Sequence, residues 1–200
     1  MISNRPFARR ALALLVLGQA AAVAVLPSTA GAAVTSAFTP VADASVYSGS
    51  PAKNFASDPT LVADNSPKTK TFMRFDVTGL TGAPIAVRLR VWVTNASSNG
   101  PEVRPLTSPW EESTVTYTTR PSVGGVVADV GKIGAGQWLE YNVKPLVTGN
   151  GVVNLALVGD SSDGTDFVSR EGPEAQRPQL VIDTYFGEYD WVAGSLWEDQ

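Results

Sequence analysis

The most regular stretch of the chain reads Ala86-Val87-Arg88-Leu89-Arg90-Val91-Trp92-Val93-Thr94. Val and Leu side chains occupy every second position, and Arg88, Arg90 and Trp92 fall between them. Successive side chains of a β-strand point to opposite faces, so this period of two predicts a strand with one buried and one solvent-facing side. The pattern favours an antiparallel sheet, because parallel strands are usually buried on both faces.

Further short strands are predicted on both sides of this one, because Gly, Pro and Asn turns recur about every 8–12 residues. The segments are 34–48, 60–63, 70–77, 102–106, 126–133, 138–143, 152–158, 167–170 and 179–185. One helical turn is expected at 144–148. Without helices to cover a sheet, two sheets must cover each other. We therefore expect an all-β fold, an antiparallel β-sandwich of about ten short strands with a jelly-roll-like architecture.

The first 32 residues have the layout of a secretory signal peptide. Arg5, Arg9 and Arg10 precede an uncharged apolar run, and Ala30 and Ala32 supply the small side chains that signal peptidase requires. The apolar run is shorter than the roughly 20 residues that span a bilayer, which argues against a retained anchor. We expect cleavage after Ala32, a secreted, extracellular protein that does not span the membrane after cleavage, and one β-sandwich domain over residues 33–185.

Composition excludes several classes of function. The chain has no cysteine and no histidine, which rules out disulfides, thiol nucleophiles, a Ser-His-Asp triad and His-ligated metal sites. Without the three arginines of the signal, 12 basic side chains stand against 19 acidic ones, a formal charge of −7. Nucleic-acid binding would call for a basic stripe instead. The sequence therefore predicts a protein that is not an enzyme of these kinds and not a nucleic-acid partner.

Ordered motifs occur over nearly the whole expected domain. They include Pro40-Val41-Ala42-Asp43-Ala44-Ser45-Val46, Asn54-Phe55-Ala56-Ser57-Asp58, Phe72-Met73-Arg74-Phe75-Asp76-Val77 and Val87-Arg88-Leu89-Arg90-Val91. They continue with Trp110-Glu111-Glu112, Thr114-Val115-Thr116-Tyr117, Arg120-Pro121, Trp138, Asn142-Val143, Leu146-Val147, Ser169-Arg170-Glu171 and Pro178-Gln179-Leu180. In this order they resemble the DNRLRE domain, also classed as carbohydrate-binding module family 96. Asn142 stands where that family usually has Asp, and Ala56 where it usually has Gly.

The resemblance implies a secreted β-sandwich that binds polysaccharide without catalysing its breakdown, and some members are similar to modules that bind alginate. The charged residues that match the family are Arg74, Arg120, Arg170 and Glu171. They would either meet an acidic glycan or form ion pairs that tie loops together.

The predicted solvent-facing side of the 86–94 strand is a second candidate glycan surface. The Trp92 indole could stack on a sugar ring, while Arg88 and Arg90 clamp a uronate carboxylate. The alternative is a solvated face on which Arg and Trp stack on each other.

Two groups of oxygen-bearing side chains could hold calcium, although no cofactor is required by the sequence. Asp160, Asp163 and Asp166 lie in one polar loop, but their spacing is not that of an EF-hand. The second group, Asp43, Asn54 and Asp58, lies near the start of the domain. Each group is equally readable as an acidic surface turn.

Two other functions stay open at this point. Residues 186–200 are aromatic and acidic, so the protein could be a cell-surface structural or adhesion module that holds a protein partner through Trp191 and Trp197. A small polysaccharide lyase that uses Tyr117 or Tyr141 is the third hypothesis. Glu111 and Glu112 are adjacent, so as strand residues they would point to opposite faces and could not act on one substrate.

Overall fold

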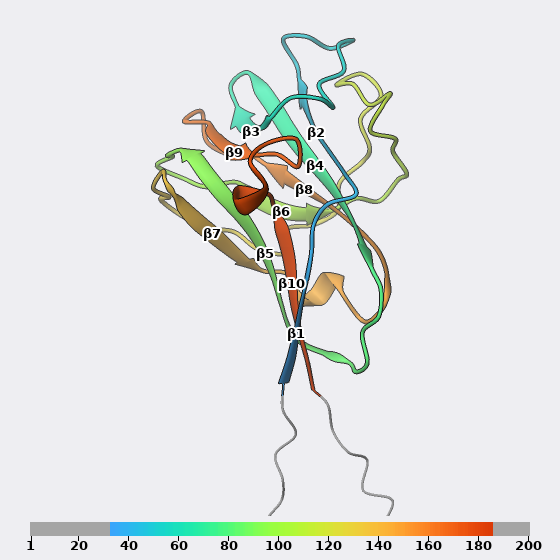
Figure 1. The fold of residues 1–200 in the computed structure, drawn as a ribbon. Helices are drawn as coiled ribbons and strands as arrows, with labels where there is room; N and C mark the ends of the chain where they lie inside the picture. The colour runs from blue at the N-terminus through green and yellow to red at the C-terminus, as the bar shows by residue number, and fades with distance from the viewer. Residues whose placement is uncertain (1–32, 186–200) are drawn as a thin grey trace, which may run out of the picture.

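A computed structural model describes residues 33–185 of the chain as ten antiparallel strands with two single-turn 3₁₀ helices (Figure 1). The strands are β1 (Ala33–Phe38), β2 (Ala42–Tyr47), β3 (Thr60–Asn65), β4 (Lys68–Val77), β5 (Pro84–Asn95), β6 (Glu102–Pro105), β7 (Gln137–Asn142), β8 (Gly151–Val158), β9 (Thr165–Val168) and β10 (Gln179–Tyr185). The helical turns are η1 (Lys144–Leu146) and η2 (Glu174–Gln176). The expected all-β sandwich is confirmed. The proposed signal peptide and the 186–200 tail lie outside the described residues.

The strands form two layers joined along one side. Sheet A contains β1, β10, β5, β7 and β9, and sheet B contains β2, β4, β8 and β6. Strand β3 belongs to both sheets, because residues 60–63 pair with β9 and residues 64–65 pair with β4. The strands thus form one curled sheet that closes over the main apolar core. Figure 1 shows β1 and β10 side by side at the end where the described chain begins and stops.

The core follows the alternation of β5. Val87, Leu89, Val91 and Val93 are at most 1% exposed, whereas Arg88, Arg90 and Trp92 are half-buried on the outer face. From the facing sheet, β4 contributes inward side chains that include Met73 and Phe75. The period of two in the sequence therefore located the buried face of β5 correctly.

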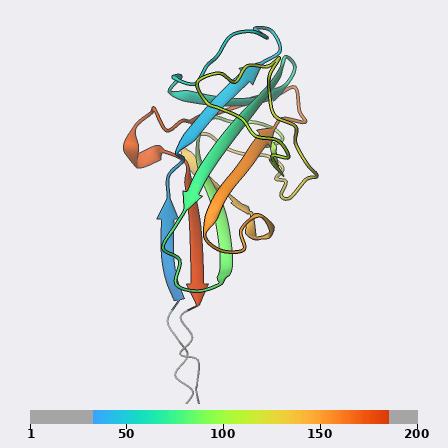
Figure 2. The same ribbon diagram turned by 90° about the vertical axis from the view of Figure 1, so that its right-hand side faces the viewer.

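A second apolar cluster lies on the outer face of sheet B, where an open sheet face would have been solvated. Phe72 of β4 and Ala156 of β8 are fully buried there beneath Trp110 and Val115. Those two side chains come from residues 106–126, an irregular segment here called the cover loop, which crosses β4 and β8 in Figure 2. The molecule is thus three layers thick on this side, and the cover loop is part of the folded structure.

The strand predicted at 126–133 is wrong. This segment makes only two isolated bridges, from Ala128 to Val103 in β6 and from Ile133 to Ser97 beyond the end of β5. One bridging partner lies in β6 of sheet B and the other is Ser97, which follows β5 of sheet A, so the segment runs from one layer toward the other. Because the segment runs across the edges of both sheets, it cannot lie alongside one strand and form a continuous series of backbone hydrogen bonds with it.

The turn expected at 144–148 is confirmed as η1. Asn142 precedes it, and its Oδ1 accepts the Lys144 backbone N–H at 3.1 Å. A carboxylate oxygen could accept the same bond, so Asn in place of the family's usual Asp preserves this turn.

Side-chain hydroxyls bridge the place where β3 changes sheets. The Ser45 and Thr71 hydroxyl oxygens lie 2.8 Å apart, Thr71 donates to the Val62 carbonyl, and Ser45 accepts the Val62 N–H. Both hydroxyls are buried. They take the place of backbone bonds from residues 60–63 of β3 to β4, because β2 and β8 occupy both edges of β4 at residues 70–74.

Replacing Thr71 with valine keeps the shape of the side chain but removes its hydroxyl. The Val62 carbonyl would then be buried without a donor, so we expect unfolding free energy to fall by about 1–3 kcal/mol. Urea denaturation measures this loss, with the same replacement at exposed Thr148 as the control. Equal stability of the two variants would contradict the bridging role.

Candidate functional site

The outer face of sheet A carries Arg88, Arg90 and Trp92, as the sequence predicted. The Trp92 and Trp138 rings meet edge to face with centroids 5.5 Å apart. The Arg90 guanidinium lies 4.5 Å from the Trp138 ring centre. Aromatic and cationic groups are therefore gathered on this face.

Both arginines of this face already have acidic partners. Arg88 Nη1 lies 2.8 Å from Asp183 Oδ2, and Arg90 Nε lies 2.7 Å from Glu140 Oε1. The hydrogen bond from Arg88 holds the pKa of Asp183 below its ordinary value. An incoming carboxylate would have to compete with these pairs, so the face is better suited to stacking than to anion binding.

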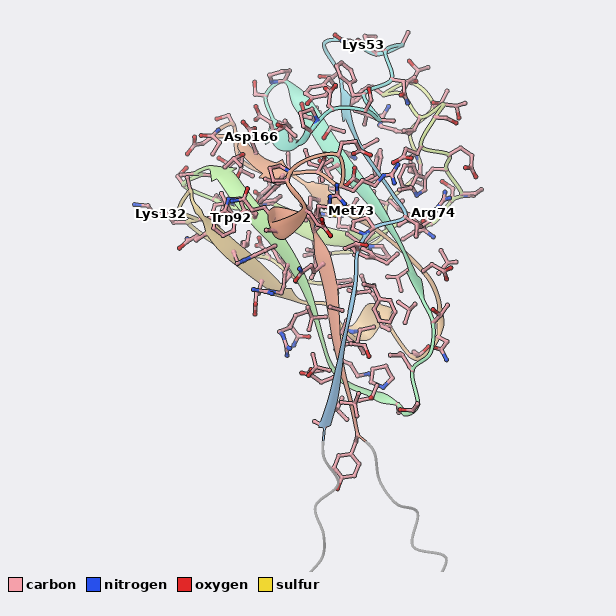
Figure 3. All side chains as sticks on the ribbon, viewed as in Figure 1. Lys53, Met73, Arg74, Trp92, Lys132 and Asp166 are labelled. Atoms are coloured by element: carbon pink, nitrogen blue, oxygen red, sulfur yellow. The ribbon has the colours of Figure 1, made fainter. Side chains whose placement is uncertain are left out.

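Arg74 lies on the opposite side of the sandwich from Trp92, with Met73 between them in Figure 3. Its guanidinium packs 5.0 Å from the Trp110 ring centre, and its Nη2 donates to the Trp110 carbonyl. Its Nε donates to Asn154 Oδ1 at 3.3 Å. These contacts make Arg74 a support of the cover loop.

Arg170 and Glu171 lie in a cluster of charged groups beside β2. Arg170 donates from Nε and Nη2 to the two Glu112 carboxylate oxygens, each at 3.0 Å, and its Nε lies 2.9 Å from Glu171 Oε1. Asp43 completes the cluster, since the Arg170 backbone N–H donates to its Oδ2 at 2.9 Å. All four charged side chains are held by contacts within the fold.

Arg120 has a different environment. It is exposed, its guanidinium lies 4.0 Å from the Tyr117 ring centre, and its Nη1 donates to the Tyr117 carbonyl. A cavity of about 230 Å³ lies beside it, at the end of the molecule where β3, β4 and β8 meet the cover loop. Its lining is Asp64, Asn65, Lys68, Thr69, Lys70, Tyr117, Arg120, Val158 and Gly159.

This cavity, here called the cationic cavity, concentrates positive charge. Within residues 33–185, Lys68, Lys70 and Arg120 have no carboxylate within 4 Å, although Asp64 also lines the cavity. Burial, followed by repulsion from Arg120, Arg104 and Lys68, lowers the pKa of Lys70. The repulsion among these cations would be relieved by a bound anion.

Sequence reasoning named Arg120 but missed Lys68 and Lys70. The available signal was their spacing: two lysines at alternate positions of one strand lie on the same face. Tyr117 entered only as a lyase candidate. The sequence did not indicate that the cover loop would bring Tyr117 and Arg120 to this strand end.

The structure groups the acidic side chains differently from the two sets of calcium ligands that the sequence predicts. Asp160 accepts a hydrogen bond from Asn99, Asp163 accepts the Ser98 N–H, and Asp166 lies on β9. In the described residues, carboxylates whose oxygens all lie within 4.8 Å of one another form two groups: Asp43, Glu112 and Glu171, and Glu102, Asp129 and Asp160.

The amide of Asn54 is fully used within the fold, and Asp58 joins neither carboxylate group. Asn54 Nδ2 donates to the Glu112 and Val115 carbonyls, while its Oδ1 accepts the Ala56 N–H. Asn54 thus anchors the cover loop to the segment after β2.

Tyr141 is 1% exposed, and its hydroxyl donates to the Pro101 carbonyl at 2.8 Å. Burial raises the pKa of Tyr141 far above its ordinary value. A buried phenol that stays protonated cannot reach a polymer or take a proton from it, so it does not fit the lyase role.

None of the helical segments in residues 33–185 is long and apolar enough to cross a membrane.

No curated protein matches the chain significantly. The model of carbohydrate-binding module family 96 matches residues 34–184, which include every described strand nearly end to end. The match covers well over half of the chain, and the protein therefore belongs to carbohydrate-binding module family 96.

Proposed function

We propose that the protein is a secreted, non-catalytic module that binds acidic polysaccharide, with uronate carboxylates held at the cationic cavity. Family membership supports carbohydrate binding. The observation that carries the acidic preference is a set of three cations around one cavity, Lys68, Lys70 and Arg120, with no carboxylate within 4 Å among residues 33–185.

The geometry of Arg120 suits carboxylate recognition. A guanidinium has five N–H donors, and here the Tyr117 carbonyl accepts from Nη1 while the ring supports the guanidinium plane. Stacking restricts the arginine before a ligand arrives, so less conformational entropy is lost on binding. The remaining donors are available for a bidentate contact with a uronate.

The net charge explains why binding should be confined to one place. The expected mature chain has a formal charge of −7, so most of its surface repels a polyanion. A small cationic site on such a surface favours a defined position along the polymer. We infer export from the 1–32 segment, which would deliver the module to extracellular glycans.

Charge reversal tests the site. We expect the variants Lys70→Glu and Arg120→Glu each to weaken affinity for a polyuronate by roughly tenfold or more, because each removes a charge-assisted contact. Isothermal titration at about 50 mM and about 500 mM salt should also show weaker binding at the higher salt. The matched control is Lys132→Glu, an exposed lysine that is not among the residues lining the cavity.

Four results would contradict the proposal. Polyuronate affinity could be independent of salt, or unchanged in both cavity variants. Alternatively, Trp92→Ala could abolish binding while the cavity variants bind normally, which would assign recognition to the outer face of sheet A and to stacking on neutral sugars. Formation of unsaturated uronate products would contradict the non-catalytic role.

A further inference from the structure

Three carboxylates converge where β2, the cover loop and the segment after β9 meet. Asp43, Glu112 and Glu171 each place an oxygen within 4.8 Å of the others. The side chains come from three separate parts of the chain, and the Glu112 Oε1 also accepts the Asp43 backbone N–H at 2.7 Å. The cluster therefore joins the unpaired edge of β2 to two loops.

One oxygen of this cluster has no hydrogen-bond partner among residues 33–185. Asp43 is 1% exposed, and its Oδ2 accepts the Arg170 backbone N–H. Its Oδ1 is buried without a hydrogen-bond partner. A buried carboxylate oxygen without a donor or a cation is costly, because its hydration is lost and not replaced.

The charge of the cluster is also incomplete. Three carboxylates face one cation, Arg170, which leaves a formal charge of −2 in a half-buried site. A divalent cation would balance the charge without protonating any of the three groups.

We propose that a calcium ion binds between Asp43, Glu112 and Glu171 and ties the cover loop and the 169–171 segment to β2. All of the donors are hard oxygens, which suit calcium or magnesium rather than softer metals. Calcium ligands lie about 2.3–2.6 Å from the ion, so two of them can be up to about 5 Å apart. The 4.8 Å limit on these oxygens falls within that span. Magnesium requires shorter bonds and keeps its water, which a buried aspartate disfavours.

Thermal melts of the purified protein after chelator treatment test the site directly. Extracellular calcium sites have dissociation constants of about 0.1–1 mM, so about 10 mM calcium chloride should raise the melting temperature by about 3–10 °C. Isothermal titration of the same protein should show one calcium site. The same concentration of magnesium should produce a much smaller shift.

The Glu171→Gln variant keeps the shape of one ligand and removes its charge, so it should lose most of the calcium-induced shift. Asp129→Asn is the matched control from the second carboxylate group and should respond as the unmodified protein does. If Glu171→Gln does not fold, Glu112→Gln serves the same purpose.

Calcium titration of the unmodified protein tests the proposed site without any variant. Absence of calcium binding by titration would overturn the proposal. An equal response to magnesium would overturn the assignment of calcium. Loss of the shift in Asp129→Asn but not in Glu171→Gln would move the site to the other carboxylates.

Discussion

Replacement of Trp110 with alanine is expected to lower the unfolding free energy by about 3–5 kcal/mol, the range typical of large aromatic side chains removed from a core. Trp110 is 5% exposed and packs on Phe72, with ring centroids 5.9 Å apart. Its indole N–H donates to Asn154 Oδ1 at 3.0 Å. The variant loses both the apolar contact and the hydrogen bond that hold the cover loop on sheet B.

The same replacement should weaken glycan binding, because Tyr117 and Arg120 lie on the loop that Trp110 anchors. Urea denaturation measures the stability and titration with a polyuronate measures the affinity. Trp92→Ala is the control, since Trp92 is half-buried on the outer face of sheet A and should cost less stability. A loss below about 1 kcal/mol for Trp110→Ala would show that the cover loop is not a structural layer.

Replacement of Tyr141 with alanine should produce a loss of similar size, about 3–5 kcal/mol. Tyr141 lies on β7 in sheet A and is fully buried in the main core. Its hydroxyl donates to the Pro101 carbonyl, which precedes β6 in sheet B. The side chain thus connects the two sheets both by packing and by a hydrogen bond.

Tyr141→Phe separates these two contributions. It keeps the ring and leaves the buried Pro101 carbonyl without this donor, so we expect a loss of about 1–3 kcal/mol. The comparison by urea denaturation should rank alanine well below phenylalanine, and phenylalanine below the unmodified protein. Equal stability of Tyr141→Phe and the unmodified protein would mean that the inter-sheet hydrogen bond contributes nothing.

Local patterns were sufficient for the architecture. The alternation in β5 identified its buried side chains, because the period of two is a property of the strand itself. The 126–133 segment shows where this reasoning ends. Its valines resemble a strand, but whether a segment joins a ladder depends on which strand edges lie beside it.

The same limit of local sequence patterns applies to the candidate glycan ligands. Sequence reasoning named seven candidate glycan ligands, but could not separate those with internal partners from those without. Arg88 pairs with Asp183 of β10, which lies 95 residues later in the chain. Arg120 contacts the Tyr117 ring and carbonyl, and within residues 33–185 it has no carboxylate within 4 Å. Which guanidinium has an acidic partner depends on contacts between residues that are far apart in the sequence.

By itself, the sequence determined the strand periodicity, the absence of thiol and imidazole chemistry and the family resemblance, because each depends on residue identity and spacing along the chain. Only the tertiary structure decided that the cover loop packs on sheet B, that Lys70 and Arg120 share a cavity and that Asp43 meets Glu112 and Glu171. Those groups are separated by dozens of residues in sequence. They meet because the apolar surfaces of the two sheets and of the cover loop are buried together, and local propensity carries no information about that long-range packing.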